Sequence, residues 1–497
     1  MTNSQRILRN TVALLLGHAT TALAGIATAV LIARFLGDVQ FGRYAFAVAF
    51  SALFSVCMTL GYETLLIREV ARDKSAAKSF ISNTAGLLIV SALATYCVLV
   101  MVIHAMGYPE ETRNVVYLIG LSFVLTSVAS VYRVSFRAFE KMQYEFRTLL
   151  IRNILRLCGV LAVLLLGYGI VAVATVSIGA AAIDLMVSWW LCRSRIVKAG
   201  VSLNSSFVRS TILKALPLAL LPFFGLVYGR TDTVMLSVMS GDAVAGWYSA
   251  ANNVSTALKP IAQLFLNALL PVMSIAYITS LGSLGRIAQR ATRYLFILGL
   301  GCSVTLSVLA PQVAQLLYGP AFAQASVALR ILAWDVLLTF VYTPLGFALV
   351  AGNRQTKMAT AAGLAAGLNL ALNLALIPHY AHVGAAIATV ATKVILLAAY
   401  AWLSRDMLNA VRLSRAILSP LAAAGLVAIA YGLLSSINVV LLAGLGLAAY
   451  LVLTVLGGGV TREDLGLLRN ALDTSATGAG PKSQRREPES DLSERDD

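Results

Sequence analysis

A small set of ionisable side chains lies inside long apolar stretches of this sequence, where charge is rare. A charged group is costly within a lipid bilayer, so such a residue usually faces a cavity or a partner and is a functional candidate. Arginine and lysine bind phosphate well, and a carboxyl group whose pKa is shifted by its surroundings can couple transport to protons. Structural ion pairs between helices are the alternative for each residue. The residues are Asp184, Arg230, Asp232, Lys259, Arg330, Asp335 and Lys393.

The densest group is the segment GRTDTVML at 229–236. Arg230 and Asp232 are two positions apart, so on a helix they point to different faces and are not expected to pair with each other. Each of them then requires another partner, or water in a cavity. In the whole set the bases outnumber the acids, and this excess of positive charge would suit a substrate that carries phosphate.

The apolar stretches are long enough to cross a membrane as helices. Of the 497 residues, 59% are hydrophobic and 12% are charged, whereas a soluble domain averages about 25% charged residues. Runs of roughly 20 apolar residues match the thickness of a bilayer core when they are helical, and helices satisfy their own backbone hydrogen bonds in lipid. We therefore expect an all-α integral membrane protein with about fourteen transmembrane helices. The expected spans are 11–33, 43–63, 79–104, 115–135, 148–167, 170–191, 215–239, 246–273, 294–317, 327–350, 358–378, 384–403, 417–434 and 438–456.

Basic residues are distributed unevenly over the ends of these spans. Lysine and arginine concentrate in cytoplasmic loops of membrane proteins. If the N-terminus is cytoplasmic, only Arg34, Arg43 and Arg113 lie in outside loops, and almost all other basic residues fall on the inside. The pattern predicts that both termini are cytoplasmic. The net charge of +16 then reflects membrane topology, and we expect no nucleic-acid partner.

The sequence contains a weak internal repeat. GDVQFGRY at 37–44 is echoed by GDAVAGWY at 241–248, and AVATV at 172–176 is echoed by AIATV at 386–390. Both pairs fall at equivalent places in successive sets of six spans. This predicts two parallel six-helix repeats followed by two C-terminal helices, an architecture found in transporters whose substrate site lies between the halves.

The duplicated loop has two interpretations. Its glycines would permit a tight turn, and Asp38 and Asp242 could cap the following helix; this structural interpretation is the favoured one. The alternative is that the two loops gate the outer mouth of a transporter.

The predicted division of the chain follows the repeat. We expect six-helix lobes over 1–200 and 201–405, two additional transmembrane helices over 406–456 and a cytoplasmic tail over 457–497. The tail is rich in charge, proline and serine, which predicts disorder.

Enzymatic function is not expected. The sequence has no GxxxxGK[ST], HExxH or GxSxG motif, and its cysteines and histidines show no metal-ligand spacing. The outside loops are short, whereas a polymerase or ligase would need a sizeable loop that carries catalytic groups. We therefore expect no catalytic residue, no metal site and no cofactor.

Four segments resemble the polysaccharide flippases of the O-antigen-translocase type. These flippases belong to the multidrug/oligosaccharidyl-lipid/polysaccharide exporter superfamily, and the similarity extends from about residue 6 to residue 405. The segments are ARFLGDVQFGRYAFAVAFSALFSVCMTLGYETLLIREVARD (33–73), FRAFEKMQYE (136–145), GRTDTVMLSVMSGDAVAGWYSAA (229–251) and LVAGNRQTKMATAAGLAAGLNLALNLALIP (349–378).

The resemblance implies a fold and a function. It implies two MATE-like six-helix lobes around a V-shaped cleft, and alternating access. It also implies translocation of an undecaprenyl-diphosphate-linked oligosaccharide across the bacterial inner membrane, for surface or exopolysaccharide biosynthesis. H⁺ or Na⁺ would be the coupling ion, and the polymerase machinery of polysaccharide synthesis a possible partner.

The resemblance also suggests site residues. Arg34, Arg230 and Asp232 carry over from the matched segments. Together with the span residues above they give two groups of candidates. The candidates for substrate binding are Arg34, Arg230, Lys259, Arg330 and Lys393, and those for ion coupling are Asp232, Asp335 and Asp184.

Two alternatives within the superfamily stay open. A peptidoglycan-precursor flippase would differ only in its cargo. A multidrug/cation antiporter would need a cavity with fewer bases and more aromatic lining.

Overall fold

The computed structural model describes residues 3–407, 415–434 and 438–459, and within them the chain is helical and contains no strand. The first half of the chain forms α1 (Asn3–Thr59), α2 (Tyr62–Arg72), α3 (Ala77–Ala105), α4 (Glu110–Ala138), α5 (Met142–Leu165) and α6 (Ile170–Arg195). The second half forms α7 (Ser205–Ser240), α8 (Asp242–Thr279), α9 (Leu281–Val308), α10 (Ala310–Tyr318), the 3-10 turn η1 (Pro320–Phe322), α11 (Ala325–Ala351) and α12 (Gln355–Leu403). Two last helices follow, α13 (Arg415–Leu433) and α14 (Val439–Leu456).

The all-α fold class is confirmed. In the described part of the chain, nine helices are long and apolar enough to cross a membrane, or up to ten if the bent α8 is one span. Two of the nine contain a backbone break, at Gly37 in α1 (φ 78°) and at Ala381 in α12 (φ 47°). Each break falls between two of the expected spans. The number of fourteen transmembrane helices stays a prediction.

The expected span 294–317 differs from the observed helices. Helix α9 begins at Leu281 and ends at Val308, and α10 then starts with a proline in its first turn. Proline has no N–H to donate but suits the first turn of a helix, so Pro311 begins a new helix instead of continuing the old one. The first part of α9 is rich in arginine, and its helical structure was therefore not visible as an apolar stretch.

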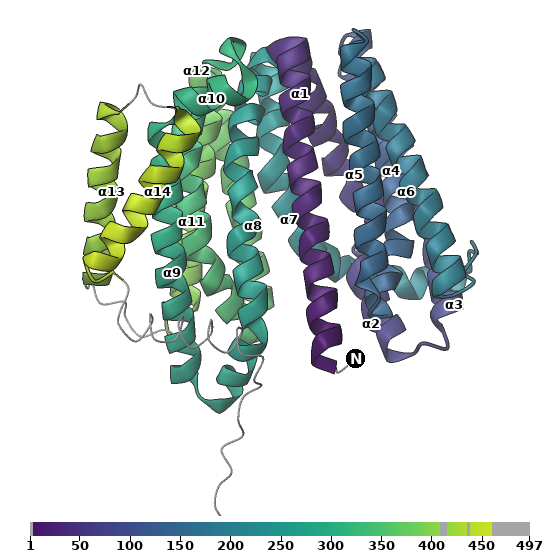
Figure 1. Ribbon diagram of the computed structural model, residues 1–497. Coiled ribbons are helices and arrows are strands. Elements are labelled where there is room, and N and C mark those ends of the chain that lie inside the picture. The colour runs from purple at the N-terminus through teal and green to yellow at the C-terminus, as the bar shows by residue number, and fades with distance from the viewer. Residues whose placement is uncertain (1–2, 408–414, 435–437, 460–497) are drawn as a thin grey trace, which may run out of the picture.

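The helices form two packed groups that we call the first lobe (α1–α6) and the second lobe (α7–α12). Helices α4, α5 and α6 pack on one another and on α1, whereas α11 packs on α8, α9 and α12. Figure 1 shows the lobes side by side, with α13 and α14 at the edge of the second lobe. The segment 197–204 joins the lobes, and the predicted boundary at residue 200 lies in it. The predicted tail lies largely outside the described residues.

Tyrosine side chains attach the last two helices to α9. The hydroxyl of Tyr450 on α14 donates to the carbonyl oxygen of Ile297 at 2.8 Å. The hydroxyl of Tyr431 on α13 lies 3.0 Å from Oγ1 of Thr305. Because these bonds satisfy polar groups that lipid cannot, they hold α13 and α14 against the second lobe.

The two lobes meet where the duplicated loops cross, at the end of the bundle opposite the N-terminus. We call this end the far face and the other end the N-terminal face. A Cβ on Gly42 would lie 1.7 Å from the carbonyl oxygen of Asp242, and a Cβ on Gly246 would lie 2.5 Å from that of Asp38. Both distances are far below van der Waals contact, so only glycine fits at either position. In each copy of the repeat, the second glycine of the loop therefore packs directly against the backbone of the other copy.

The duplicated aspartates also connect the lobes. Trp247 Nε1 donates to Asp38 Oδ2 at 3.0 Å, and Arg43 Nε lies 3.3 Å from Asp242 Oδ2. Arg43 also pairs with Glu111. The interpretation that the aspartates cap the following helix fits Asp38, whose Oδ1 accepts from the backbone N–H of Val39 at 2.9 Å. It does not fit Asp242, whose carboxylate is engaged instead by Arg43 and by Ser237. Gly37 and Gly241 do form the expected turns, with φ of 78° and 93°.

Candidate functional site

A triad of charged side chains lies inside the second lobe. Asp335 on α11 has a fully buried carboxylate, 2.5 Å from Nζ of Lys259 on α8 and 3.5 Å from Nζ of Lys393 on α12. The structure thus brings together three of the residues that the sequence predicts as site residues. The triad carries one acid against two bases, so it retains one positive charge.

Lys393 lies between two aromatic rings. Its ammonium is 4.8 Å from the ring centroid of Tyr228 and 4.9 Å from that of Tyr342. The negative face of an aromatic ring attracts a cation at this distance, which compensates part of the cost of burying the charge. The rings also fix the direction of the lysine side chain, which lines a cavity.

This cavity lies among α7, α8, α11 and α12 and has a volume of about 430 Å³. Polar contacts are offered by Gln263, Asn267 and Thr343, and Lys393 supplies a positive charge. The remaining wall is apolar and aromatic, and includes Phe224 and Tyr400. Small-molecule sites typically combine apolar walls with a few placed polar groups, so this cavity is a candidate binding site.

Asp232 has a different environment from Asp335. It is 3% exposed and accepts hydrogen bonds from Tyr248 Oη at 2.5 Å, Thr389 Oγ1 at 2.8 Å and Asn373 Nδ2 at 2.6 Å. All three donors are neutral. The arrangement therefore leaves a buried carboxylate without a cation among the described side chains that it contacts, and such a group can take up a proton or a monovalent cation.

The surroundings of Asp232 could also hold a small cation. The Asn373 amide donates to Asn369 Oδ1 at 3.1 Å, while its own oxygen is buried and accepts no hydrogen bond from the described residues. The single hydroxyl hydrogen of Thr389 is within reach of the carbonyl oxygen of Ala385, at 3.0 Å, as well as of Asp232. Oxygen ligands of this kind suit hard cations. Thr389 belongs to the repeated AIATV segment, which the sequence analysis singled out without assigning it a function.

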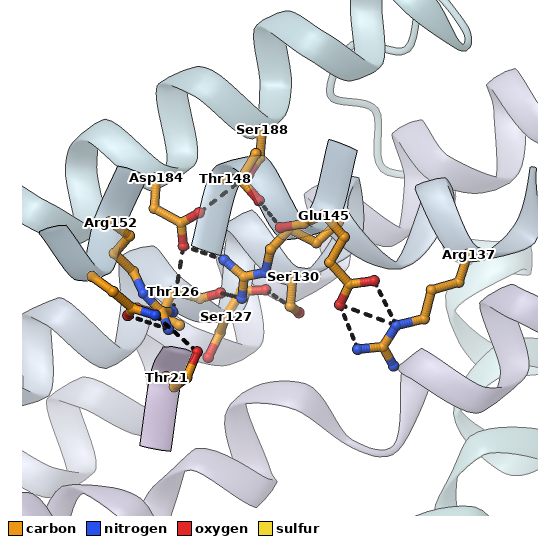
Figure 2. Close-up of polar contacts among 12 residues, drawn as sticks. Thr21, Thr126, Ser127, Ser130, Arg137, Glu145, Thr148, Arg152, Asp184 and Ser188 are labelled. Carbon is orange, nitrogen blue, oxygen red and sulfur yellow. Dashed lines mark hydrogen bonds and ion pairs between the residues drawn. The ribbon is translucent and has the colours of Figure 1, made fainter. Parts of the chain in front are cut away.

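The first lobe holds a second charged cluster (Figure 2). Asp184 on α6, 0% exposed, pairs with Arg133 on α4 and lies 3.6 Å from Nη1 of Arg152 on α5. Ser188 Oγ donates to the same carboxylate at 3.3 Å. Asp184 is therefore placed as an ion-pair acceptor for two arginines, away from Asp232 and Asp335.

A further pair extends this cluster along α4 and α5. Arg137 and Glu145 form a bidentate pair: Nε donates to Oε2 at 2.8 Å and Nη2 donates to Oε1 at 2.5 Å. Figure 2 shows this pair beside the Asp184 cluster, with Thr148 between them. Polar side chains thus extend from the end of α4 and the start of α5 into the interior of the first lobe.

The arginines of the first lobe are not among the predicted site residues. Arg133, Arg152 and Arg156 lie within the expected spans 115–135 and 148–167, near the ends that the sequence predicts to be cytoplasmic. The structure places them inside helices α4 and α5. The available signal was the spacing: Arg152 and Arg156 are four residues apart and so lie on one helix face.

Three predicted site residues do not join either cluster. Arg34 donates from Nε to the carbonyl oxygen of Leu317 at 2.8 Å, at the C-terminal end of α10 on the far face. Arg330 is exposed. Arg230 is half-buried on α7, and no charged partner of it occurs in the described part of the chain. Arg230 and Asp232 do not pair with each other, as the sequence predicts.

Long apolar helices, charges buried within them and two lobes that meet at the far face define a multi-pass membrane protein with a transporter fold. The chain belongs to the family of polysaccharide biosynthesis proteins, which matches residues 7–276, more than half of its length. No curated protein sequence matches the chain.

Solved structures share this fold. A lipid II flippase, MurJ, in its inward closed conformation has a TM-score of 0.72 at 13% identity, covering 90% of this chain and 99% of that one. An inward-facing MATE family multidrug transporter of the MOP superfamily has a TM-score of 0.65 at 15% identity, covering 80% and 98%. An outward-facing MATE transporter has a TM-score of 0.57 at 16% identity, covering 81% and 95%. The predicted resemblance to this superfamily is confirmed, and these neighbours are transporters or flippases, not enzymes.

Proposed function

We propose that this protein is a flippase for an undecaprenyl-diphosphate-linked oligosaccharide and works by alternating access. The observation that carries the proposal is the surplus of positive charge inside the membrane-spanning lobes. Asp335 is shared by two lysines and Asp184 by two arginines, while Arg230 has no described charged partner. Unpaired cations are costly in a bilayer, and an anionic cargo such as a diphosphate compensates them.

The contact of the lobes supports alternating access. Gly42 and Gly246 bring the lobes into close contact at the far face, whereas Asp184 and Asp335 lie in the interior of α6 and α11. In the proposed cycle this form accepts cargo from the N-terminal face, which the distribution of basic residues predicts to be cytoplasmic. Opening the far face would then release the cargo to the outer leaflet.

Asp232 supports ion coupling. Its buried carboxylate has only neutral donors around it, so H⁺ or Na⁺ stabilises the form in which it is enclosed. A coupling ion that binds one conformation better than the other shifts the equilibrium between them. Asp335 and Asp184 are already paired with basic residues, which makes Asp232 the strongest of the three predicted candidates.

The alternatives in the superfamily differ in cargo. A peptidoglycan-precursor flippase would carry the same diphosphate, and the family of polysaccharide biosynthesis proteins favours an oligosaccharide for surface polymers instead. The aromatic wall of the second-lobe cavity is a feature that a multidrug/cation antiporter would also need. Lys393 in that wall disfavours cationic drugs and favours an anion.

The test is the leaflet location of the lipid-linked oligosaccharide in cells depleted of the protein. We expect the intermediate to accumulate in the cytoplasmic leaflet and surface polysaccharide to be lost. Arg230→Gln should fail to restore export, whereas Arg147→Gln, which removes an exposed arginine of α5, should restore it. Accumulation of unpolymerised units in the outer leaflet would instead indicate a polymerase or ligase. Cell lysis without a polysaccharide defect would indicate the peptidoglycan precursor, and altered drug susceptibility alone a multidrug transporter.

A further inference from the structure

The duplicated loops end in tyrosines that contact opposite charges. Tyr44 and Tyr248 occupy the same position in the two repeats. The hydroxyl of Tyr248 donates to Asp232 at 2.5 Å, and that of Tyr44 accepts from Nη2 of Arg156 at 2.5 Å. Equivalent tyrosines thus mark an acidic site in the second lobe and a basic site in the first.

The helices that contact these tyrosine sites, α5 and the first part of α12, also differ in charge. Arg152 and Arg156 are four residues apart on α5, the fifth long helical segment of its repeat. Asn369 and Asn373, also four apart, lie on the first part of α12, the corresponding segment of the second repeat. In the second lobe the Asn373 amide faces the Asp232 carboxylate, whereas in the first lobe the guanidinium groups of Arg152 and Arg156 line a cavity.

Positive charge in the first lobe exceeds what its internal ion pairs need. Arg133 already pairs with Asp184, so a second arginine at 3.6 Å from that carboxylate gives only a partial further gain. The charges of Arg133 and Arg156 both act unfavourably on Arg152. A purely structural ion pair would be complete with one arginine, because each additional buried cation is costly unless an anion accompanies it.

A cavity of about 190 Å³ adjoins the surplus charge. It is lined by Arg152, Arg156 and Tyr44, and by the hydroxyl-bearing residues Ser122, Thr126 and Ser177. A cavity volume of roughly 10–15 Å³ is enough to hold a water molecule, so this cavity has room for a larger polar group. The Nε of Arg156 is buried and has no acceptor in the described part of the chain.

We propose that this first-lobe cavity binds a phosphoryl group. The planar guanidinium groups of Arg152 and Arg156 supply forked donors that match phosphate oxygens, and the Nε of Arg156 gains the acceptor that it lacks. The hydroxyl groups of Ser122 and Ser177 donate to the carbonyl oxygens of Ile119 and Val173 in this structure, and rotation of each hydroxyl would turn its hydrogen toward the anion. The phosphoryl group comes from the diphosphate of a prenyl-linked cargo or from inorganic phosphate; the first source rests on the proposed function, whereas the site itself does not.

The experiment measures anion binding by the full-length protein in nanodiscs with isothermal titration calorimetry. The probes are geranyl diphosphate, inorganic phosphate and geraniol, which has the prenyl chain without the phosphoryl group. The variants are Arg152→Gln and Arg156→Gln, with Arg147→Gln as the matched control. Arg147 lies on the same helix, but it is exposed and rests over the Tyr144 ring. Thermal unfolding of each variant shows whether it remains folded.

We expect geranyl diphosphate to bind and geraniol not to bind. Arg152→Gln and Arg156→Gln should each weaken the diphosphate about tenfold or more, since a hydrogen bond to a charged group is worth about 1.5–3 kcal/mol, while Arg147→Gln should not. If inorganic phosphate binds as tightly as geranyl diphosphate, the phosphoryl site is confirmed and its ligand is a free anion. The proposal is overturned if no phosphoryl probe binds, or if Arg147→Gln weakens binding as much as the cavity variants do. A flippase assay on the same variants reports separately on the proposed function.

Discussion

Asp335 on α11 and Lys259 on α8 form a 2.5 Å ion pair inside the second lobe. Lys393 approaches the same carboxylate from α12 at 3.5 Å. The acid therefore joins three helices, and the two lysines differ in role: Lys259 forms the close pair, and Lys393 faces the cavity.

Removing the acid should destabilise the fold more than removing the second lysine. Asp335→Asn leaves two ammonium groups near each other without compensation, and breaking a buried pair in this way costs about 3–5 kcal/mol. Lys393→Met leaves the neutral pair of Asp335 and Lys259 intact, so we expect it to fold but to lose export of the lipid-linked cargo. Thermal unfolding in detergent, together with the leaflet assay, checks both expectations. Equal loss of stability in the two variants would show that Lys393 is a structural residue.

Binding of the coupling ion at Asp232 should raise the thermal stability of the protein. A ligand that binds only the folded state at 100 times its Kd adds about 2.7 kcal/mol of stability. We expect added Na⁺, or lowered pH, to raise the unfolding temperature of the wild type, and Asp232→Asn to remove that response. The control is Glu110→Gln, which changes an exposed carboxylate in the first turn of α4. A response that survives in Asp232→Asn would place the coupling ion elsewhere.

Gly42→Ala should open the far face. The added methyl group would lie 1.7 Å from the Asp242 carbonyl oxygen, which is backbone and cannot move aside, so the lobes must separate. Spin labels at Gly107 and Ala321, in a cysteine-free background, should report a longer distance across that face. Gly25→Ala on the same helix is the control, since its Cβ meets nothing within 4 Å. An unchanged distance in Gly42→Ala would contradict the gate.

The contact between Arg354 and Asp406 should make stability depend on pH. Arg354 Nη1 donates to Asp406 Oδ1 at 2.8 Å, and this bond lowers the pKa of the Asp406 carboxyl and raises the pKa of Arg354. Because the folded-state pKa of Asp406 is depressed, the stabilisation is complete above the ordinary pKa of about 4 and is lost as pH falls through the lower, folded-state value.

Asp406→Asn should therefore lower the unfolding temperature at pH 7 and have no effect once the carboxyl of the wild type is protonated. The Asp406 side chain is 50% exposed, and exposed pairs contribute at most about 1 kcal/mol, so the effect should be small. A loss of the same size at both ends of the pH range would mean that the pair acts through packing and not through charge.

Much of the fold could be predicted because the membrane constrains it locally. A span is visible as a long apolar run, and the divergence of Arg230 from Asp232 follows from the angle between helix positions two apart. Which charges meet could not be predicted. Asp335, Lys259 and Lys393 come from three helices, and their contact depends on how those helices rotate and pack.

Two further features were hidden for physical reasons. Arg152 and Arg156 lie near the basic end of an apolar stretch, and without the depth of the helix in the membrane they resemble cytoplasmic arginines. Gly42 looks like a turn residue in sequence, whereas the structure uses it to let two helices cross closely.

The reciprocal contact of the two loops has a consequence for the origin of the chain. Gly42 meets the backbone of the second copy, and Gly246 meets that of the first. A surface that contacts its own duplicate in this way is the isologous interface of a two-fold homodimer. A six-helix ancestor with this loop could already have paired with itself, and fusion of two such genes would have kept the interface while freeing each half to acquire its own charge.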